Sequence, residues 1–257
     1  MPYLTESLAV AGRILIELGR QRRSLVFWSV FPVSILLLIG TILTGRTGLA
    51  FDAALNQAAA SALVGAGFFF SALGGTVAIL VSEREQGTLR RLFLSPLRGL
   101  SYWLGICLAQ GTIGLGQTIL VYGVGAIWGA RFQGSWLLGG LVLVLSLMGY
   151  VGMGFILGSL LGRRTEDVNA LVATFGLPLV ILGGAFLPTS LFPQSLLDWA
   201  KYDPVYHMNE ALLAVGADGE GWSAIENHLR FLVGFTVLAV AGGVLAYRHM
   251  LRQERYL

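Results

Sequence analysis

The side chains that could catalyse a reaction are few and widely spaced in this sequence. The three histidines, His207, His228 and His249, stand in predicted loops or at the ends of apolar segments, and none pairs at metal-ligand spacing. Cys107 is the single cysteine and lies in an apolar run, so it forms no CxxC motif. A P-loop needs GxxxxGK[ST], and the only lysine, Lys201, follows an alanine. We therefore expect no catalytic residue, no metal and no cofactor in this chain.

A polar stretch over residues 83–98 has a more specific pattern. Residues 82–96 read Ser-Glu-Arg-Glu-Gln-Gly-Thr-Leu-Arg-Arg-Leu-Phe-Leu-Ser-Pro. Gly87 is expected to end the preceding helix, Thr88 to cap a new one, and Pro96 to end it. An apolar patch at positions i, i+3 and i+4 is formed by Leu89, Leu92 and Phe93. A short helix with one apolar patch and a charged rim suits docking of another protein; the alternative is an interfacial helix that touches only lipid head groups.

The elements around this stretch are predicted to be membrane helices. Only 12% of the residues are charged and 55% are apolar, too few charges for the surface of a soluble domain. Apolar segments without ionisable residues qualify, or nearly do, to cross ~30 Å of hydrocarbon. They are 25–44, 59–82, 102–129, 136–161, 168–187 and 231–247. The fold class is therefore all-α, with six spans in one domain over residues 1–257. Spans without ionisable groups argue against an ion-coupled carrier.

The basic residues predict the orientation. Thirteen of the seventeen precede span one, follow span six, or lie between spans two and three or four and five. The other side has Arg46, Arg131, Lys201 and Arg230. Because basic residues favour the cytoplasmic side, we expect a cell-membrane protein with both ends in the cytoplasm.

Two further segments are predicted to lie at the membrane surfaces. Residues 1–23 form an amphipathic interfacial helix on lipid, with its apolar face made by Leu4, Leu8, Ala11, Leu15 and Leu18, and with Arg13 away from it. In the outer segment 188–228, Asp203 caps a short helix that starts at Pro204. That helix is too short to span and is expected to dip into the outer leaflet as a re-entrant element.

Glycines 154, 158 and 162 form a GxxxGxxxG ridge in span four, with Gly149 and Gly152 before it. Small residues at this spacing let membrane helices approach closely. The ridge serves either packing within the chain or a subunit interface.

The stretch ERE-x-GTL-x-x-L-x-x-SP at 83–96 resembles the coupling helix of ABC-2 type transporter permeases. The resemblance extends over the chain. It includes the interfacial helix, the six spans, GG-x-FLP at 183–188 and the stretch from Pro204 to Asn209, Glu210 and Ala211.

This resemblance implies a permease subunit of an ATP-driven exporter. Its partners would be a second six-span permease, identical or paralogous, and separate ATP-binding subunits that carry ATP and magnesium. No nucleic acid is expected as a partner. The candidates for docking the ATPase are Glu83, Arg84, Glu85, Gly87, Thr88, Leu89, Leu92 and Pro96. Spans two and five would face the substrate route, lined by Phe68, Phe69, Phe70 and Phe175; lipid-facing or packing aromatics are the alternative. A route with aromatics and no charges suits an amphiphile such as a drug, lipid, glycolipid or polysaccharide. The competing function is a membrane scaffold or assembly factor that docks a soluble partner without transport.

Overall fold

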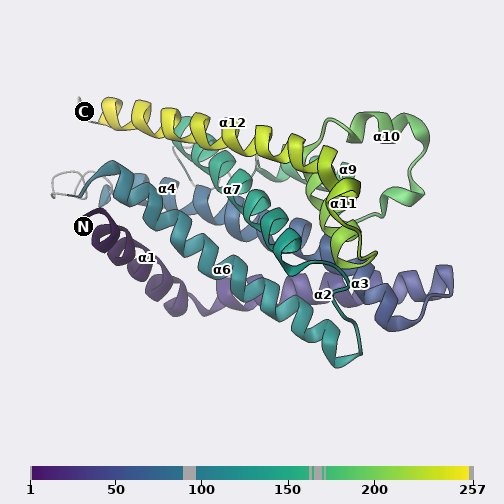
Figure 1. The fold of residues 1–257 in the computed structure, drawn as a ribbon. Coiled ribbons are helices and arrows are strands. Elements are labelled where there is room, and N and C mark those ends of the chain that lie inside the picture. The colour runs from purple at the N-terminus through teal and green to yellow at the C-terminus, as the bar shows by residue number, and fades with distance from the viewer. Residues whose placement is uncertain (1, 89–96, 162–163, 165–169, 171, 255–257) are drawn as a thin grey trace.

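The computed structural model describes residues 2–88, 97–161, 164, 170 and 172–254, and this part of the chain is helical without a strand. The helices form an elongated bundle (Figure 1). The N- and C-terminal regions lie together at one end of it, which we call the terminal end. The short helices α10 (Gln194–Ala200) and α11 (Pro204–Gly216) lie at the opposite, far end.

Within the described residues, five helices are long and apolar enough to cross a membrane. They are α2 (Arg22–Thr47), a continuous helix of α3 (Phe51–Ser61), η1 (Ala62–Gly74) and α4 (Gly75–Glu85), then α6 (Gly99–Ile127), α7 (Trp136–Leu160) and α12 (Trp222–Glu254). They contain five of the six predicted spans. Of the remaining segment, 168–187, the structure describes a shorter apolar helix, Val172–Leu182, formed by η2 (Val172–Gly176) and α9 (Leu177–Leu182). The preceding residues 165–169 lie outside the described part.

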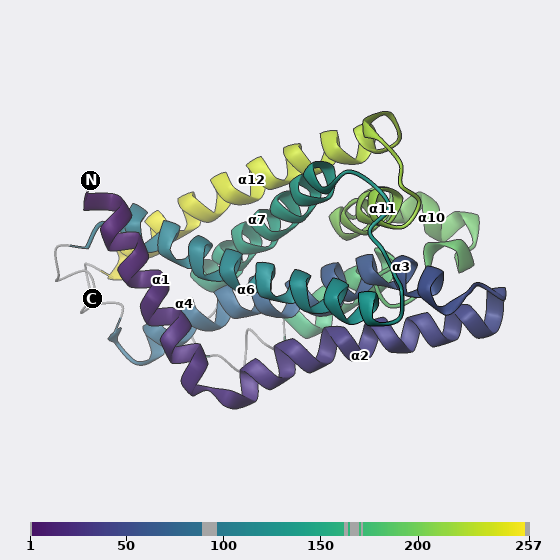
Figure 2. The same ribbon diagram turned by 60° about the horizontal axis from the view of Figure 1, so that its bottom comes forward.

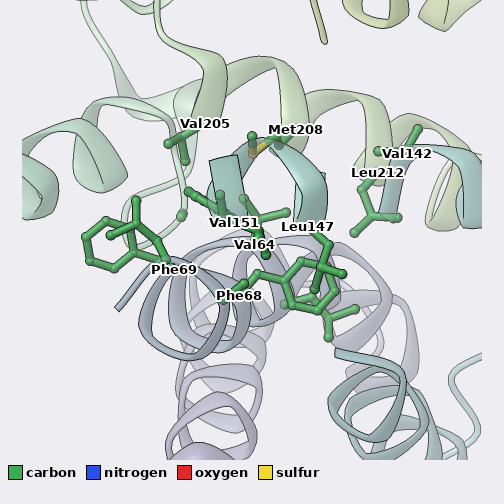
Figure 3. Close-up of a cluster of buried hydrophobic side chains, with 14 of the residues drawn as sticks. Val64, Phe68, Phe69, Val142, Leu147, Val151, Val205, Met208 and Leu212 are labelled. Carbon is green, nitrogen blue, oxygen red and sulfur yellow. The ribbon is translucent and has the colours of Figure 1, made fainter. Parts of the chain in front are cut away.

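The continuous helix from Phe51 to Glu85 is the most deeply buried of the five. Its middle turns are π-helical, and its side chains meet α7 and α11 in the core. Figure 3 shows Phe68 and Val64 of this helix below Met208 of α11. The segment is rich in alanine and glycine, so neighbouring helices can approach it closely.

The described glycines of the predicted ridge, and Gly149 and Gly152 before them, pack within the chain. A Cβ added to Gly152 would lie 2.6 Å from the carbonyl carbon of Ala239 in α12. At Gly154 it would lie 2.7 Å from the Cβ of Thr76 in α4. Gly158 likewise meets Leu80, whereas Gly162 lies outside the described residues. The described part of the ridge therefore holds α7 against α4 and α12, as the packing alternative predicts.

Helix α1 (Pro2–Arg20) bends sharply away from α2 at Gln21 (Figure 2). Of the predicted apolar face, Leu4 and Leu8 are more than half exposed, whereas Ala11 and Leu18 are buried. The buried face consists of Ser7, Val10, Ala11, Ile14 and Leu18. The reason is a close approach at Gly105 of α6, where an added Cβ would lie 2.6 Å from that of Val10. Packing on a helix, rather than lipid alone, selects the buried face.

The far end contains the predicted short helix. α11 starts at Pro204, and the Asp203 carboxylate accepts a hydrogen bond from the backbone N–H of Val205 at 2.9 Å. The buried face of α11 packs on α12, α3 and α7. Before it come α10 and a turn of 3-10 helix, Thr189–Leu191.

Candidate functional site

Glu83, in the last turn of α4, lies at a junction of three helices at the terminal end. The Arg13 guanidinium of α1 forms an ion pair with its carboxylate. The Tyr102 hydroxyl of α6 donates a hydrogen bond to the same carboxylate at 2.5 Å. The side chain of Glu83, one of the predicted ATPase-docking residues, is 10% exposed. It ties α4 to α1 and α6.

The residues that follow Glu83 reinforce this attachment. Arg84 donates to the backbone carbonyl of Ser159 in α7 at 3.2 Å. The Thr88 hydroxyl donates to the backbone carbonyl of Glu83 at 3.0 Å, which closes the end of α4. Gly87 has φ +66°, a left-handed conformation that favours glycine. The chain therefore turns sharply after α4, as the sequence predicts.

A second contact fastens α1 to the start of α6. The Ser101 hydroxyl donates to the Glu6 carboxylate at 2.5 Å. This hydrogen bond lowers the pKa of Glu6 below its ordinary value. The Arg98 guanidinium lies over the Tyr3 ring, 4.3 Å from its centroid. The two ends of the 83–98 loop are thus both held by α1.

Among the predicted docking residues, Glu85 and Gly87 are exposed and Arg84 is half-buried. Leu89, Leu92 and Pro96 lie outside the described residues. Sequence reasoning missed Arg13 and Tyr102 as partners of Glu83. An acidic residue at the end of an apolar span could have indicated a buried ion pair. The sequence does not indicate which basic residue is its partner.

An apolar cavity of about 310 Å³ lies between the continuous helix, α7, α11, α12 and the Val172–Leu182 helix. Phe69 and Phe175, two predicted route residues, both line it, with Tyr150 from α7. The Tyr150 hydroxyl has no hydrogen-bond partner within the described residues. Phe68 and Phe70 lie elsewhere. Phe68 is 1% exposed in the core, and the ring of Phe70 makes edge-to-face contact with Phe27 and Phe31 of α2.

The far end brings together the two outer motifs on which part of the resemblance rests. Asn209 of α11 donates to the carbonyl of Gly184 at 3.4 Å, and Ser61 of α3 donates to the Asn209 amide oxygen at 3.3 Å. The neighbouring Glu210 accepts from the Thr189 hydroxyl at 2.7 Å. Burial raises the pKa of Glu210. These bonds join span two to the segment that follows α9.

Two histidines also meet at this end. The Nδ1 atoms of His207 and His228 lie 3.0 Å apart, and the His207 Nε2 is 2.9 Å from the carbonyl oxygen of Lys201. Since the Nε2–H donates to that carbonyl, the His207 Nδ1 accepts from His228. Burial lowers the pKa of His207, which favours this neutral form. The described residues contain no group of three His, Cys, Asp or Glu side chains that could hold a metal ion.

Comparison with known proteins agrees with this architecture. The model of the ABC-2 family transporter protein matches residues 49–245. The chain is also similar to the probable multidrug ABC transporter permease YbhR of Escherichia coli strain K12, with 28% identity over 130 residues, half of this chain. The same protein of Escherichia coli O157:H7 matches equally well. The chain covers 35% of the length of each of these relatives.

The family match covers every long apolar helix from the continuous Phe51–Glu85 helix to most of α12, and with it the cavity and the outer motifs. The chain is thus a multi-pass membrane protein that belongs to the ABC-2 family of transporter proteins.

Proposed function

We propose that this chain is the permease subunit of an ATP-driven exporter that moves an amphiphile across the cell membrane. A second six-span permease, identical or paralogous, completes the pathway. Separate subunits bind ATP and magnesium and hydrolyse ATP, while this chain does not. The observation that carries the proposal is a continuous helix that runs from the buried Glu83 junction to the wall of an apolar cavity, within a chain of the ABC-2 family.

The geometry supports transmission of force along that helix. The ATPase docks on the 83–98 loop, and its motion reaches α1 through Arg13 and α6 through Tyr102. Phe69 lies sixteen positions before Glu85 on this helix, which is about 24 Å at the rise of an α-helix and less where its turns are π-helical. Because packed helices move as rigid bodies, displacement at the terminal end shifts the cavity wall.

The proposed function includes a membrane topology. The terminal end faces the cytoplasm, residues 168–187 form the fifth span, and α10 and α11 are re-entrant elements of the outer leaflet. The distribution of basic residues supports this orientation. The burial of one face of α11 on the bundle supports a helix that enters the membrane without crossing it.

The cargo fits an apolar cavity with few polar groups. A volume of about 310 Å³ lies at the small end of the range for ligand sites. The Tyr150 hydroxyl offers one hydrogen bond, and Phe69 and Phe175 offer ring faces. The candidate cargoes are a drug, a lipid, a glycolipid or a polysaccharide. The name of the E. coli relatives, multidrug permeases, favours the drug.

A pull-down separates this function from that of a scaffold. The tagged chain is purified in mild detergent as wild type and as Leu89→Asp plus Leu92→Asp. Gln133→Asp plus Ser135→Asp, at exposed positions of the loop between α6 and α7, introduces the same two charges and is the control. We expect a soluble ATPase to accompany wild type and control and to be lost from the loop variant, and the complex to drive ATP-dependent flux in vesicles. A complex without flux favours the scaffold, and absence of any ATPase contradicts the proposal.

A further inference from the structure

A second pocket, of about 340 Å³, lies at the terminal end between α1, α2, α4 and α6. It is separate from the apolar cavity, with which it shares no lining residue. The exposed side chains of Glu17, Gln21 and Gln86 stand at its mouth, while Gln110 and Trp28 lie deeper. The pocket therefore leads from a polar rim to a mixed polar and aromatic interior.

Gln110 lines this pocket, and its side-chain amide makes no hydrogen bond among the described residues. Its side chain is 1% exposed, and neither the amide nitrogen nor the amide oxygen has a hydrogen-bond partner in the described part of the chain. Leaving such a group unpaired costs about 1–3 kcal/mol. Gln117, two turns later on the same face of α6, differs: it donates to the Trp28 carbonyl at 3.0 Å and accepts from Ser71 at 2.9 Å. The fold therefore satisfies one glutamine and leaves the other for a ligand.

Gly75 of α4 packs closely on that amide. Opposite Gln110 stands Gly75, where an added Cβ would lie 3.0 Å from the Gln110 amide nitrogen and 3.1 Å from the Trp28 ring. Any larger residue at that position would crowd both groups. The ligand that pairs with the amide must supply an acceptor for its N–H groups and a donor for its oxygen.

The charged side chains that line the pocket sum to one negative charge. Three charged side chains line it, and two of them, Arg13 and Glu83, neutralise one another. The third, Glu17, forms no ion pair with any residue that the structure describes. The lining thus has one uncompensated negative charge at the mouth and an indole ring deeper in the pocket, and the face of such a ring attracts cations.

We propose that this pocket binds the head group of an amino-alcohol amphiphile. The ammonium is attracted by Glu17 and donates hydrogen bonds to the Gln110 side-chain oxygen or to Gln21 and Gln86 at the mouth. A hydroxyl or ester oxygen of the ligand accepts from the Gln110 amide N–H. The alkyl chain lies against the apolar lining, which includes Ile14, Leu18 and Ile79. The head group belongs either to a membrane lipid with an ethanolamine head or to a free alkylamine. Binding needs no ATPase, so it stands apart from the export function.

The test uses the full chain in nanodiscs of phosphatidylcholine, with radiolabelled N-dodecylethanolamine as the probe and empty nanodiscs as the blank. We expect saturable binding, about tenfold weaker with Gln110→Leu, since one buried hydrogen-bonded group is worth about 1.4 kcal/mol. Glu17→Gln is expected to weaken binding two- to fivefold. Dodecyltrimethylammonium, a cation without N–H or hydroxyl groups, is expected to compete poorly. Adding phosphatidylethanolamine to the nanodiscs weakens probe binding if the lipid is the natural source and leaves it unchanged if a free amine is.

Thermal unfolding without probe provides the second measurement. Gln110→Leu removes an unpaired buried amide and is expected to leave the unfolding midpoint unchanged or raised, whereas Gln117→Leu breaks two bonds and lowers it. The proposal is overturned if N-dodecylethanolamine does not bind, or if it binds wild type and Gln110→Leu equally. Gln110 is then a hydrated amide only. Equal competition by dodecyltrimethylammonium overturns it as well.

Discussion

Replacing Arg13 with methionine tests whether the Glu83 junction holds the terminal end together. Methionine keeps much of the length and apolar contact of the arginine stem but removes its charge. Glu83 would then retain the Tyr102 hydroxyl as its donor, with its side chain only 10% exposed. A carboxylate in that position is poorly solvated and destabilises the folded state.

The magnitude follows from the burial of the two partners. Breaking a fully buried ion pair costs about 3–5 kcal/mol. The Arg13 side chain is 40% exposed, so water reaches this pair and the expected loss falls to about 2 kcal/mol. Glu83→Gln still accepts from Tyr102 and leaves an arginine that can turn to water, so we expect about 1 kcal/mol. The double variant should be no less stable than Arg13→Met, because its glutamine carries no charge.

The assay is thermal unfolding in detergent at one heating rate, for wild type, both single variants and the double variant. A loss of 2 kcal/mol corresponds to about 4–8 °C in a chain of this size. Arg20→Met, on the same helix and exposed, is the control and should change the midpoint by less than about 1 °C. If Arg13→Met behaves like this control, or if the two single effects simply add, the junction does not stabilise the fold as reasoned here.

Three further predictions concern the core and the far end. Gly152→Leu should abolish a monodisperse folded peak in size exclusion, because the new side chain meets the α12 backbone, whereas Gly140→Leu, with nothing within 4 Å of its Cβ, should elute like wild type. Burial raises the pKa of Asp203 to about 7, so the folded state holds a proton that the unfolded state releases above about pH 4. Wild type should therefore lose up to about 2–3 kcal/mol more than Asp203→Asn between pH 5 and pH 8, measured by unfolding; an equal pH response in both chains contradicts this. Asn209→Leu removes two buried hydrogen bonds but leaves the Ser61 hydroxyl donating to the Gly184 carbonyl at 3.4 Å, so it should lower stability by about 1–2 kcal/mol, against no change for the exposed Gln194→Leu.

Local features of the chain could be predicted where their cause is local. Long runs without charged residues become membrane-length helices because lipid leaves no other way to satisfy the backbone. Asp203 followed by Pro204 starts a helix, and Gly87 allows the turn after α4, because each effect depends on a few neighbouring residues. The polar loop at 83–98 and the outer motifs could also be recognised from the sequence, although their contacts could not.

The predicted face of α1 and the four phenylalanines illustrate the limit. Leu4 and Leu8 fit an apolar stripe, but contact with Gly105 rotates the buried face toward Val10. Successive helical residues point about 100° apart, so Phe68, Phe69 and Phe70 have to point in different directions, and the neighbouring helices decide which one reaches a cavity.

By itself, the sequence determined that the chain is helical, embedded in a membrane and punctuated by a polar loop, because hydrophobic length and turn chemistry act over short distances. Only the tertiary structure decided that Glu83 is buried against Arg13 and Tyr102, 70 and 19 residues away. It alone also decided that Gln117 is satisfied while Gln110 opens into a pocket. Identical side chains acquire different roles there because pairing depends on which helices meet, and that is a property of the whole bundle.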